Sequence, residues 1–113
     1  MKKEWIKKVS TDLQLEPILE DWILMNSDPE RIEEFIDYYE WNKEENTVED
    51  PEELEILAQL ICNSAEDGFA MDAITDEIKE RLREFIKANA KDFPKTYDQW
   101  SATQSEEWKA LTA

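Results

Sequence analysis

Apolar residues recur at helical spacing along nearly the whole chain, and very little in the sequence interrupts them. Only one Gly and four Pro occur in 113 residues, so few positions favour turns. No segment shows the apolar–polar alternation of a half-buried strand. Hydrophobic residues make up 41% of the chain, enough to bury a core. We therefore expect an all-α fold: one compact domain over residues 1–113, with about five helices and a short C-terminal helical tail.

Two helix starts are marked by a Pro that follows a capping residue. The segment Ser27-Asp28-Pro29-Glu30 has the form of a capping box, with Ser27 as the cap of a helix that runs to about Trp41. Asp50-Pro51 predicts a second start and a helix over about 51–65. That helix is apolar around more than half of its circumference, which is typical of a central helix. Gly68 is placed to end it in a left-handed conformation.

Apolar stripes predict the remaining helices. One covers about 3–13, and the next begins near Pro17, which suits a first helical turn. A later helix covers about 73–90 and mixes acids and bases on its outer side. The tail over about 96–111 is expected to form one or two short helices.

Negative charge is concentrated in the middle of the chain. The formal net charge is −16. Residues 10–77 carry 22 acids against two bases, whereas the segments before and after them are slightly basic. Self-repulsion of this kind lowers stability, so it indicates a cationic partner that offsets it. The same sign disfavours direct contact with nucleic acid or with an anionic membrane.

The sequence contains no recognisable catalytic or metal-binding pattern. The chain has no His, which removes the usual general base and the His-containing metal sites. Its only cysteine, Cys62, lies among apolar residues and is interpreted as a core residue in a reducing compartment. One Gly does not suffice for a phosphate-binding loop, and the acids lack the spacing of a calcium loop. We therefore expect a cytoplasmic protein without enzymatic activity, cofactor or metal, and without a membrane segment.

A strip of carboxylates is expected along the helix that follows Pro29. Successive residues are rotated by about 100°, which places six acids within about 120° of arc, opposite the apolar face. Tyr38 flanks this strip and Trp41 lies inside it, and acids between positions 45 and 55 extend it. The residues predicted to contact a partner are Glu30, Glu33, Glu34, Asp37, Tyr38, Glu40, Trp41, Glu44, Glu45 and Glu49.

Two interpretations of the strip remain open. It is either a solvated helix face or a protein-binding surface. A solvated face normally mixes signs, as the helix over 73–90 does. Aromatic residues beside acids are typical anchors of an interface, and the acids speed encounter with a basic partner. Trp41 has its own alternative, because it can instead fold over the edge of the core.

Three functions follow from these patterns. The first is a stoichiometric inhibitor of the immunity or antitoxin type, which covers the basic surface of a toxin or nuclease. The second is a DNA mimic that inhibits a DNA-binding, restriction or CRISPR-type protein, although one helix carries fewer charges than the same length of duplex. The third is a subunit or adaptor, either a monomer or a homodimer, that binds through apolar residues. Its candidate contact residues are Ile56, Leu60, Trp100 and Trp108.

Overall fold

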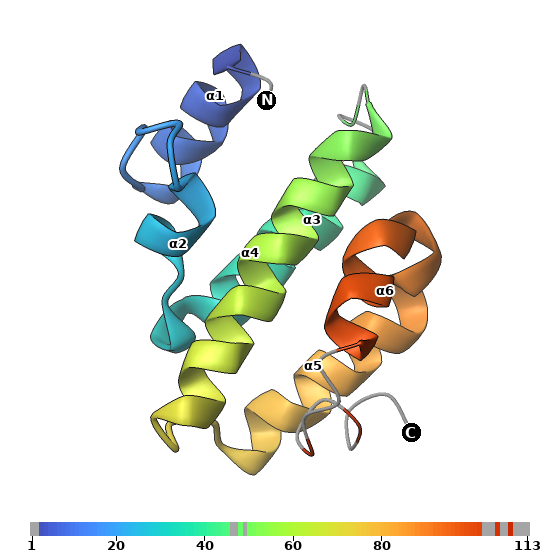
Figure 1. Ribbon diagram of the computed structural model, residues 1–113. Coiled ribbons are helices and arrows are strands. Elements are labelled where there is room, and N and C mark those ends of the chain that lie inside the picture. The colour runs from blue at the N-terminus through green and yellow to red at the C-terminus, as the bar shows by residue number, and fades with distance from the viewer. Residues whose placement is uncertain (1–2, 46–47, 49, 103–105, 107–108, 110–113) are drawn as a thin grey trace.

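The structure is a computed structural model that describes residues 3–45, 48, 50–102, 106 and 109. All regular secondary structure in these residues is helical, which confirms the all-α prediction (Figure 1). The α-helices are α1 (Lys3–Leu13), α2 (Trp22–Asn26), α3 (Ile32–Glu44), α4 (Pro51–Ala70), α5 (Asp76–Asn89) and α6 (Pro94–Ser101). Short 3-10 helices at Pro29–Arg31 and Ala90–Asp92 precede α3 and α6.

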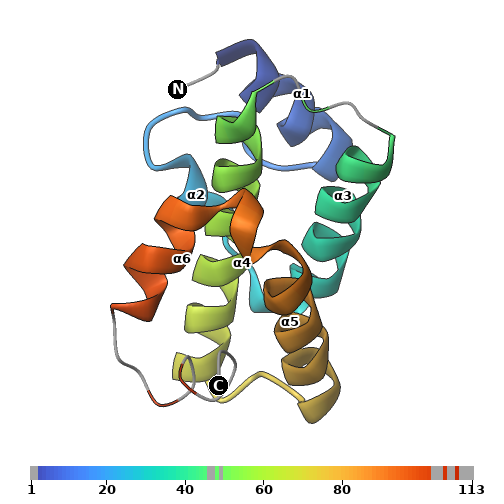
Figure 2. The ribbon, with the colours of Figure 1, turned by 90° about the vertical axis from the view of Figure 1, so that its right-hand side faces the viewer.

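Helix α4 is the centre of the molecule, as its apolar circumference predicts. Helices α2, α3 and α6 all pack against it, and Figures 1 and 2 show them arranged around its length. Its buried apolar residues are Leu54, Ile56, Leu57, Ala58, Leu60, Ile61, Cys62 and Ala65. The core is therefore organised around one helix.

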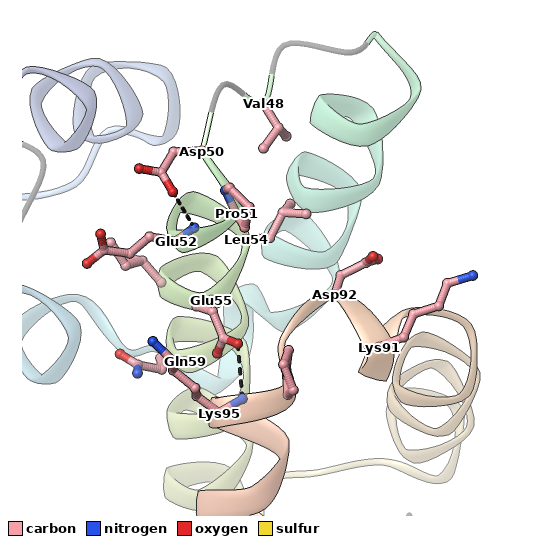
Figure 3. A pocket seen from close by; sticks show the side chains of 12 residues that line it. Val48, Asp50, Pro51, Glu52, Leu54, Glu55, Gln59, Lys91, Asp92 and Lys95 are labelled. Atoms are coloured by element: carbon pink, nitrogen blue, oxygen red, sulfur yellow. Dashed lines mark hydrogen bonds between the residues drawn. The ribbon is translucent and has the colours of Figure 1, made fainter.

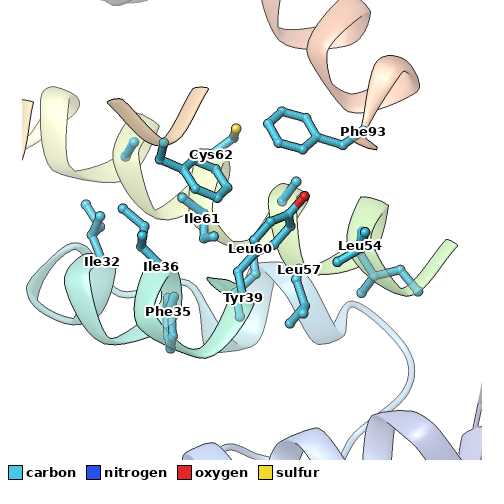
Figure 4. Packing of buried hydrophobic residues seen from close by; sticks show 14 of the residues in the cluster. Ile32, Phe35, Ile36, Tyr39, Leu54, Leu57, Leu60, Ile61, Cys62 and Phe93 are labelled. Atoms are coloured by element: carbon cyan, nitrogen blue, oxygen red, sulfur yellow. The ribbon is translucent and has the colours of Figure 1, made fainter. Parts of the chain in front are cut away.

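Three aromatic rings join α3, α5 and the start of α6 beside this helix. The ring of Tyr39 lies edge-on to Phe85 at 4.9 Å between centroids, and Phe85 stacks on Phe93 at 5.5 Å. All three side chains are buried, and Figure 4 shows Tyr39 and Phe93 among the apolar side chains of α3 and α4. Such pairs contribute about 0.5–1.5 kcal/mol each beyond the area that they bury.

The N-terminus of α4 has the capping box that its sequence predicts. The Asp50 carboxylate accepts a hydrogen bond from the backbone N–H of Glu52 at 2.9 Å. In return, the Glu53 carboxylate accepts the backbone N–H of Asp50 at 2.9 Å. Pro51 occupies the first helical position, where its missing N–H has no intrahelical partner to lose.

The start of the helical segment that leads into α3 differs from the sequence prediction. Its cap is Asp28, which accepts the N–H of Glu30, and not Ser27. The Ser27 hydroxyl instead donates to the Ile23 carbonyl at 2.6 Å and accepts from Asn63 of α4. The Ser27 hydroxyl, which the sequence predicted to cap α3, is thus hydrogen-bonded to α2 and α4 instead. The helix itself extends past Trp41, to Glu44.

The helix expected from Pro17 begins five residues later, at Trp22, because residues 14–21 form a loop. Asn26 holds this loop against α2. Its side chain accepts the N–H of Glu16 at 2.9 Å and donates to the Glu16 carbonyl at 3.1 Å. Asp21, just before α2, has a positive φ of 57°. This left-handed residue and the Asn26 bridge replace the first turn of the expected helix.

Gly68 does not end α4, which continues to Ala70. It is a buried helical residue at a close approach to two other segments. A Cβ at this position would lie 2.2 Å from the Ile74 Cδ1 and 3.0 Å from the Pro29 Cβ. The left-handed residue after α4 is Asp72, with φ 53°. Glycine is therefore present because of packing and not because of chain reversal.

We expect Gly68→Ala to lower the free energy of unfolding by about 1 kcal/mol. Overpacking costs about 1–3 kcal/mol, and the better helix propensity of Ala offsets about 1 kcal/mol of it. Urea unfolding followed by circular dichroism measures the difference. In an Ile74→Val background, which lacks Cδ1, the same substitution should cost less. A stabilisation of about 1 kcal/mol by Gly68→Ala alone would show that the site is open.

In the last part of the fold, helix boundaries differ from expectation by one to three residues. Helix α5 begins at Asp76, because the Thr75 side chain caps it by accepting the N–H of Ile78. Helix α6 is one of the short helices predicted for the tail. Its Tyr97 and Trp100 are partly buried against the core. The predicted contact residue Trp108 lies outside the described residues.

Candidate interaction surface on α3

Two carboxylates at the centre of the predicted strip pair with an arginine from a helix that is distant in sequence. Arg81 of α5 reaches across to α3 and contacts Asp37 at 2.6 Å and Glu40 at 2.8 Å. These two hydrogen bonds raise the pKa of the Arg81 guanidinium. Asp37 and Glu40 therefore join α3 to α5, and Arg81 offsets one of their two negative charges.

A third strip residue, Glu34, is paired within its own helix region. Arg31 donates from Nε to Glu34 Oε1 at 3.1 Å and from Nη2 to the other carboxylate oxygen. This hydrogen bonding by Arg31 lowers the pKa of the Glu34 carboxyl. The same guanidinium donates to the Leu13 carbonyl at the end of α1 and lies over the Phe35 ring. Arg31 thus compensates Glu34 while holding α1 against α3.

Four carboxylates at the two ends of the strip are exposed and form no ion pair with any other described residue. They are Glu30 and Glu33 at one end and Glu44 and Glu45 at the other. Lys43 lies next to the second pair but turns inward, toward Asp92 and the Asn89 side chain. Glu49 lies outside the described residues. The strip therefore has uncompensated charge at its ends and paired charge at its centre.

The two aromatic residues of the strip differ in their freedom to contact a partner. Trp41 is 48% exposed and lies outside the hydrophobic core. Tyr38 is half-buried, and its hydroxyl donates to the Asp12 carboxylate of α1 at 2.7 Å. The Tyr38 ring lies beneath Trp41, with 6.3 Å between the ring centroids. Trp41 is thus an exposed indole that stacks on the half-buried Tyr38. It does not fold over the edge of the core.

Most acids near the start of α4, expected to extend the strip, serve as helix caps. Asp50 and Glu53 cap α4 itself, and Glu53 is only 3% exposed. The Glu55 carboxylate accepts the backbone N–H groups of Lys95 and Thr96 at the start of α6, at 3.0 and 2.9 Å. Figure 3 shows the Glu55–Lys95 contact from close by. Among the described acids at the start of α4, only Glu52 is exposed without serving as a cap.

A hollow of about 920 Å³ lies between the start of α4 and the start of α6 (Figure 3). Glu52, Glu55 and Asp92 line it together with Lys91 and Lys95. The lining thus mixes both signs, and its central carboxylate, Glu55, already caps α6. The described residues that line the hollow therefore form ordinary helix contacts and do not indicate a catalytic acid–base pair.

Burial raises the pKa of the Cys62 thiol, which keeps it protonated and unreactive in the core. Among the described residues, no cluster of three or more Cys, Asp or Glu side chains could hold a metal ion. No helix in the described part of the chain is long and apolar enough to cross a membrane.

No family model, curated protein or solved structure matches this chain. What the protein does is therefore inferred from its own side chains.

Proposed function

We propose that the protein is a stoichiometric inhibitor of the immunity or antitoxin type, acting in the cytoplasm. It binds a basic protein, and covers the partner's nucleic-acid-binding surface with the outer face of α3. The observation that supports this most is the set of four exposed carboxylates at the two ends of α3 that form no ion pair with another described residue. Glu33 and Glu44 lie on α3 with the half-exposed Trp41, Glu30 lies in the 3-10 helix before it, and Glu45 follows its last residue.

The division of the strip assigns different roles to its residues. Uncompensated charges at both ends attract a cationic surface from a distance, which raises the association rate. An exposed indole supplies apolar area that is buried only in the complex, as in interface hot spots. The paired centre, Asp37 and Glu40 with Arg81, holds α3 at a fixed position on α5.

The other two functions receive less support from the same residues. A DNA mimic needs a dense row of free negative charge, whereas Arg31 and Arg81 offset two of the three negative charges with which they pair in the middle of α3. An adaptor that binds through Ile56 and Leu60 needs those residues at the surface. They are 4% and 0% exposed and belong to the core.

We expect charge reversal at the ends of α3 to slow association with the partner at least tenfold at low salt. The variant is Glu33→Lys/Glu44→Lys/Glu45→Lys, because these carboxylates have no internal partner whose loss would disturb the fold. Electrostatic steering changes association rates by about 10–10³-fold, and salt screens the effect. Stopped-flow mixing with the basic protein captured from cell lysate measures the rate constant.

The control variant, Glu4→Lys/Glu77→Lys/Glu84→Lys, makes the same change in net charge on α1 and α5. All three of its sites are exposed. It should slow association less, since none of its three sites lies on α3. Equal slowing by both variants would mean that only net charge matters, and the assignment to α3 would then be wrong.

A further inference from the structure

Large exposed apolar side chains are concentrated in one short segment. Five such residues occur in the described chain, and three of them fall within residues 16–25. Ile18 is 46% exposed, Leu24 67% and Met25 52%. Methionine adapts its shape readily, which suits it to binding surfaces. Helix α2 and the loop before it therefore present apolar area that nothing in the described chain covers.

This segment is held rigidly, so its apolar residues cannot turn inward. Trp22 is 1% exposed, and its indole N–H donates to the Ser10 hydroxyl of α1 at 2.9 Å. Asn26, one helical turn later, bridges to the backbone of residue 16 and to the Trp22 carbonyl. Because Trp22 and Asn26 occupy the inner face of α2, Leu24 and Met25 must face outward. The surface is organised before any partner arrives.

Acidic side chains flank the apolar residues and restrict what can cover them. Glu16, Glu20 and Asp21 are exposed and form no ion pair with any described residue. A second copy of this chain would bring like charges together, and an anionic membrane would be repelled. No strand is present in the described residues to accept a partner by edge pairing. The complementary occupant is an amphipathic helix whose apolar face is bordered by Lys or Arg.

We propose that residues 16–25 form a docking surface for such a basic amphipathic helix. Ile18, Leu24 and Met25 contact its apolar face, and the three carboxylates pair with its basic edges. The surface is separate from α3, since α2 and α3 both pack on α4 and lie on opposite sides of it in Figure 2. Its existence does not depend on the function proposed for α3.

The test uses a synthetic helical peptide of Leu and Lys, with all its Leu on one face, and a scrambled peptide of the same composition. Fluorescence anisotropy of the labelled peptides gives the dissociation constants, and amide chemical shifts of the protein locate the contact. We expect the ordered peptide to bind at least tenfold more tightly than the scrambled one, with shift changes centred on residues 16–25. Leu24→Ser/Met25→Ser should weaken binding at least tenfold.

Met71→Ser is the matched control, because Met71 is 68% exposed but lies outside the segment. It should leave the affinity unchanged. The Glu33→Lys/Glu44→Lys/Glu45→Lys variant should also retain peptide-induced shifts at residues 16–25, which separates this surface from α3. Shift changes centred on α3, equal binding of the scrambled peptide, or full affinity of Leu24→Ser/Met25→Ser would each overturn the proposal. Sedimentation provides a further test. If the protein has twice the mass of one chain and Leu24→Ser/Met25→Ser restores the mass of one chain, the occupant is a second copy and the proposal is overturned.

Discussion

Truncation of Trp22 to alanine is expected to lower the free energy of unfolding by about 4 kcal/mol, since Trp→Ala changes in a core cost about 3–5 kcal/mol. The side chain is 1% exposed and joins two elements. Its ring packs in the core beneath α2, and its N–H is hydrogen-bonded to Ser10 of α1. The truncation therefore removes both a large apolar volume and the polar contact that ties α1 to α2.

Urea unfolding followed by far-UV circular dichroism measures this loss without relying on the Trp signal that the substitution removes. Ser10→Ala separates the two contributions, because it keeps the indole ring but leaves its buried N–H unpaired. That variant should cost about 1–3 kcal/mol, less than the truncation. A cost below about 1 kcal/mol for Trp22→Ala would mean that Trp22 is not a core residue.

Glu55→Ala is expected to lower the free energy of unfolding by about 3 kcal/mol. Helix α6 has no capping side chain of its own at Phe93, so Glu55 of α4 takes that role. Its carboxylate accepts two backbone N–H groups and the Thr96 hydroxyl, the last at 2.6 Å. Loss of a helix cap costs about 1–2 kcal/mol, and the backbone N–H of the buried Thr96, left unpaired, adds about 1–3 kcal/mol.

The matched control is Glu52→Ala, which removes the same side chain one turn earlier on the same helix. Glu52 is exposed and its carboxylate caps no described helix, so its loss should change stability by less than about 0.5 kcal/mol. Amide hydrogen exchange at Lys95 and Thr96 provides a local readout, and Glu55→Ala should accelerate it. Equal costs for the two variants would show that α6 does not depend on a cap from α4.

The parts of the fold that follow from local sequence were predictable. The capping box at Asp50 depends on residues three apart, and the apolar stripe of α4 depends on helical period alone. The errors arose where distant residues compete for the same group. Asn63 donates to the hydroxyl of Ser27 from 36 positions along the chain, and Asn26 holds the backbone of residue 16. No local pattern reports such contacts.

The candidate site shows the same division. Helical spacing predicts that the carboxylates share one face of the helix after Pro29. In the structure, the described ones lie on α3 or directly before and after it. Helical spacing could not show that Arg81 pairs with Asp37 and Glu40, because Arg81 lies more than 40 residues away and its own helix mixes signs. Nor could it assign Glu55 to the cap of α6. Charge patterns locate a surface, but pairing across elements decides which of its charges remain free.

The central claim is that the free carboxylates at the ends of α3 bind a basic protein. The most direct test is a pull-down from lysate of the source cell, with the tagged wild type beside a Glu30→Gln/Glu33→Gln/Glu44→Gln/Glu45→Gln variant. Bound proteins are identified by mass spectrometry after washes at low and at high salt. We expect one basic protein to be retained by the wild type at low salt, and to be lost at high salt and from the variant. Retention of no basic protein, or equal retention by the variant, would contradict the claim.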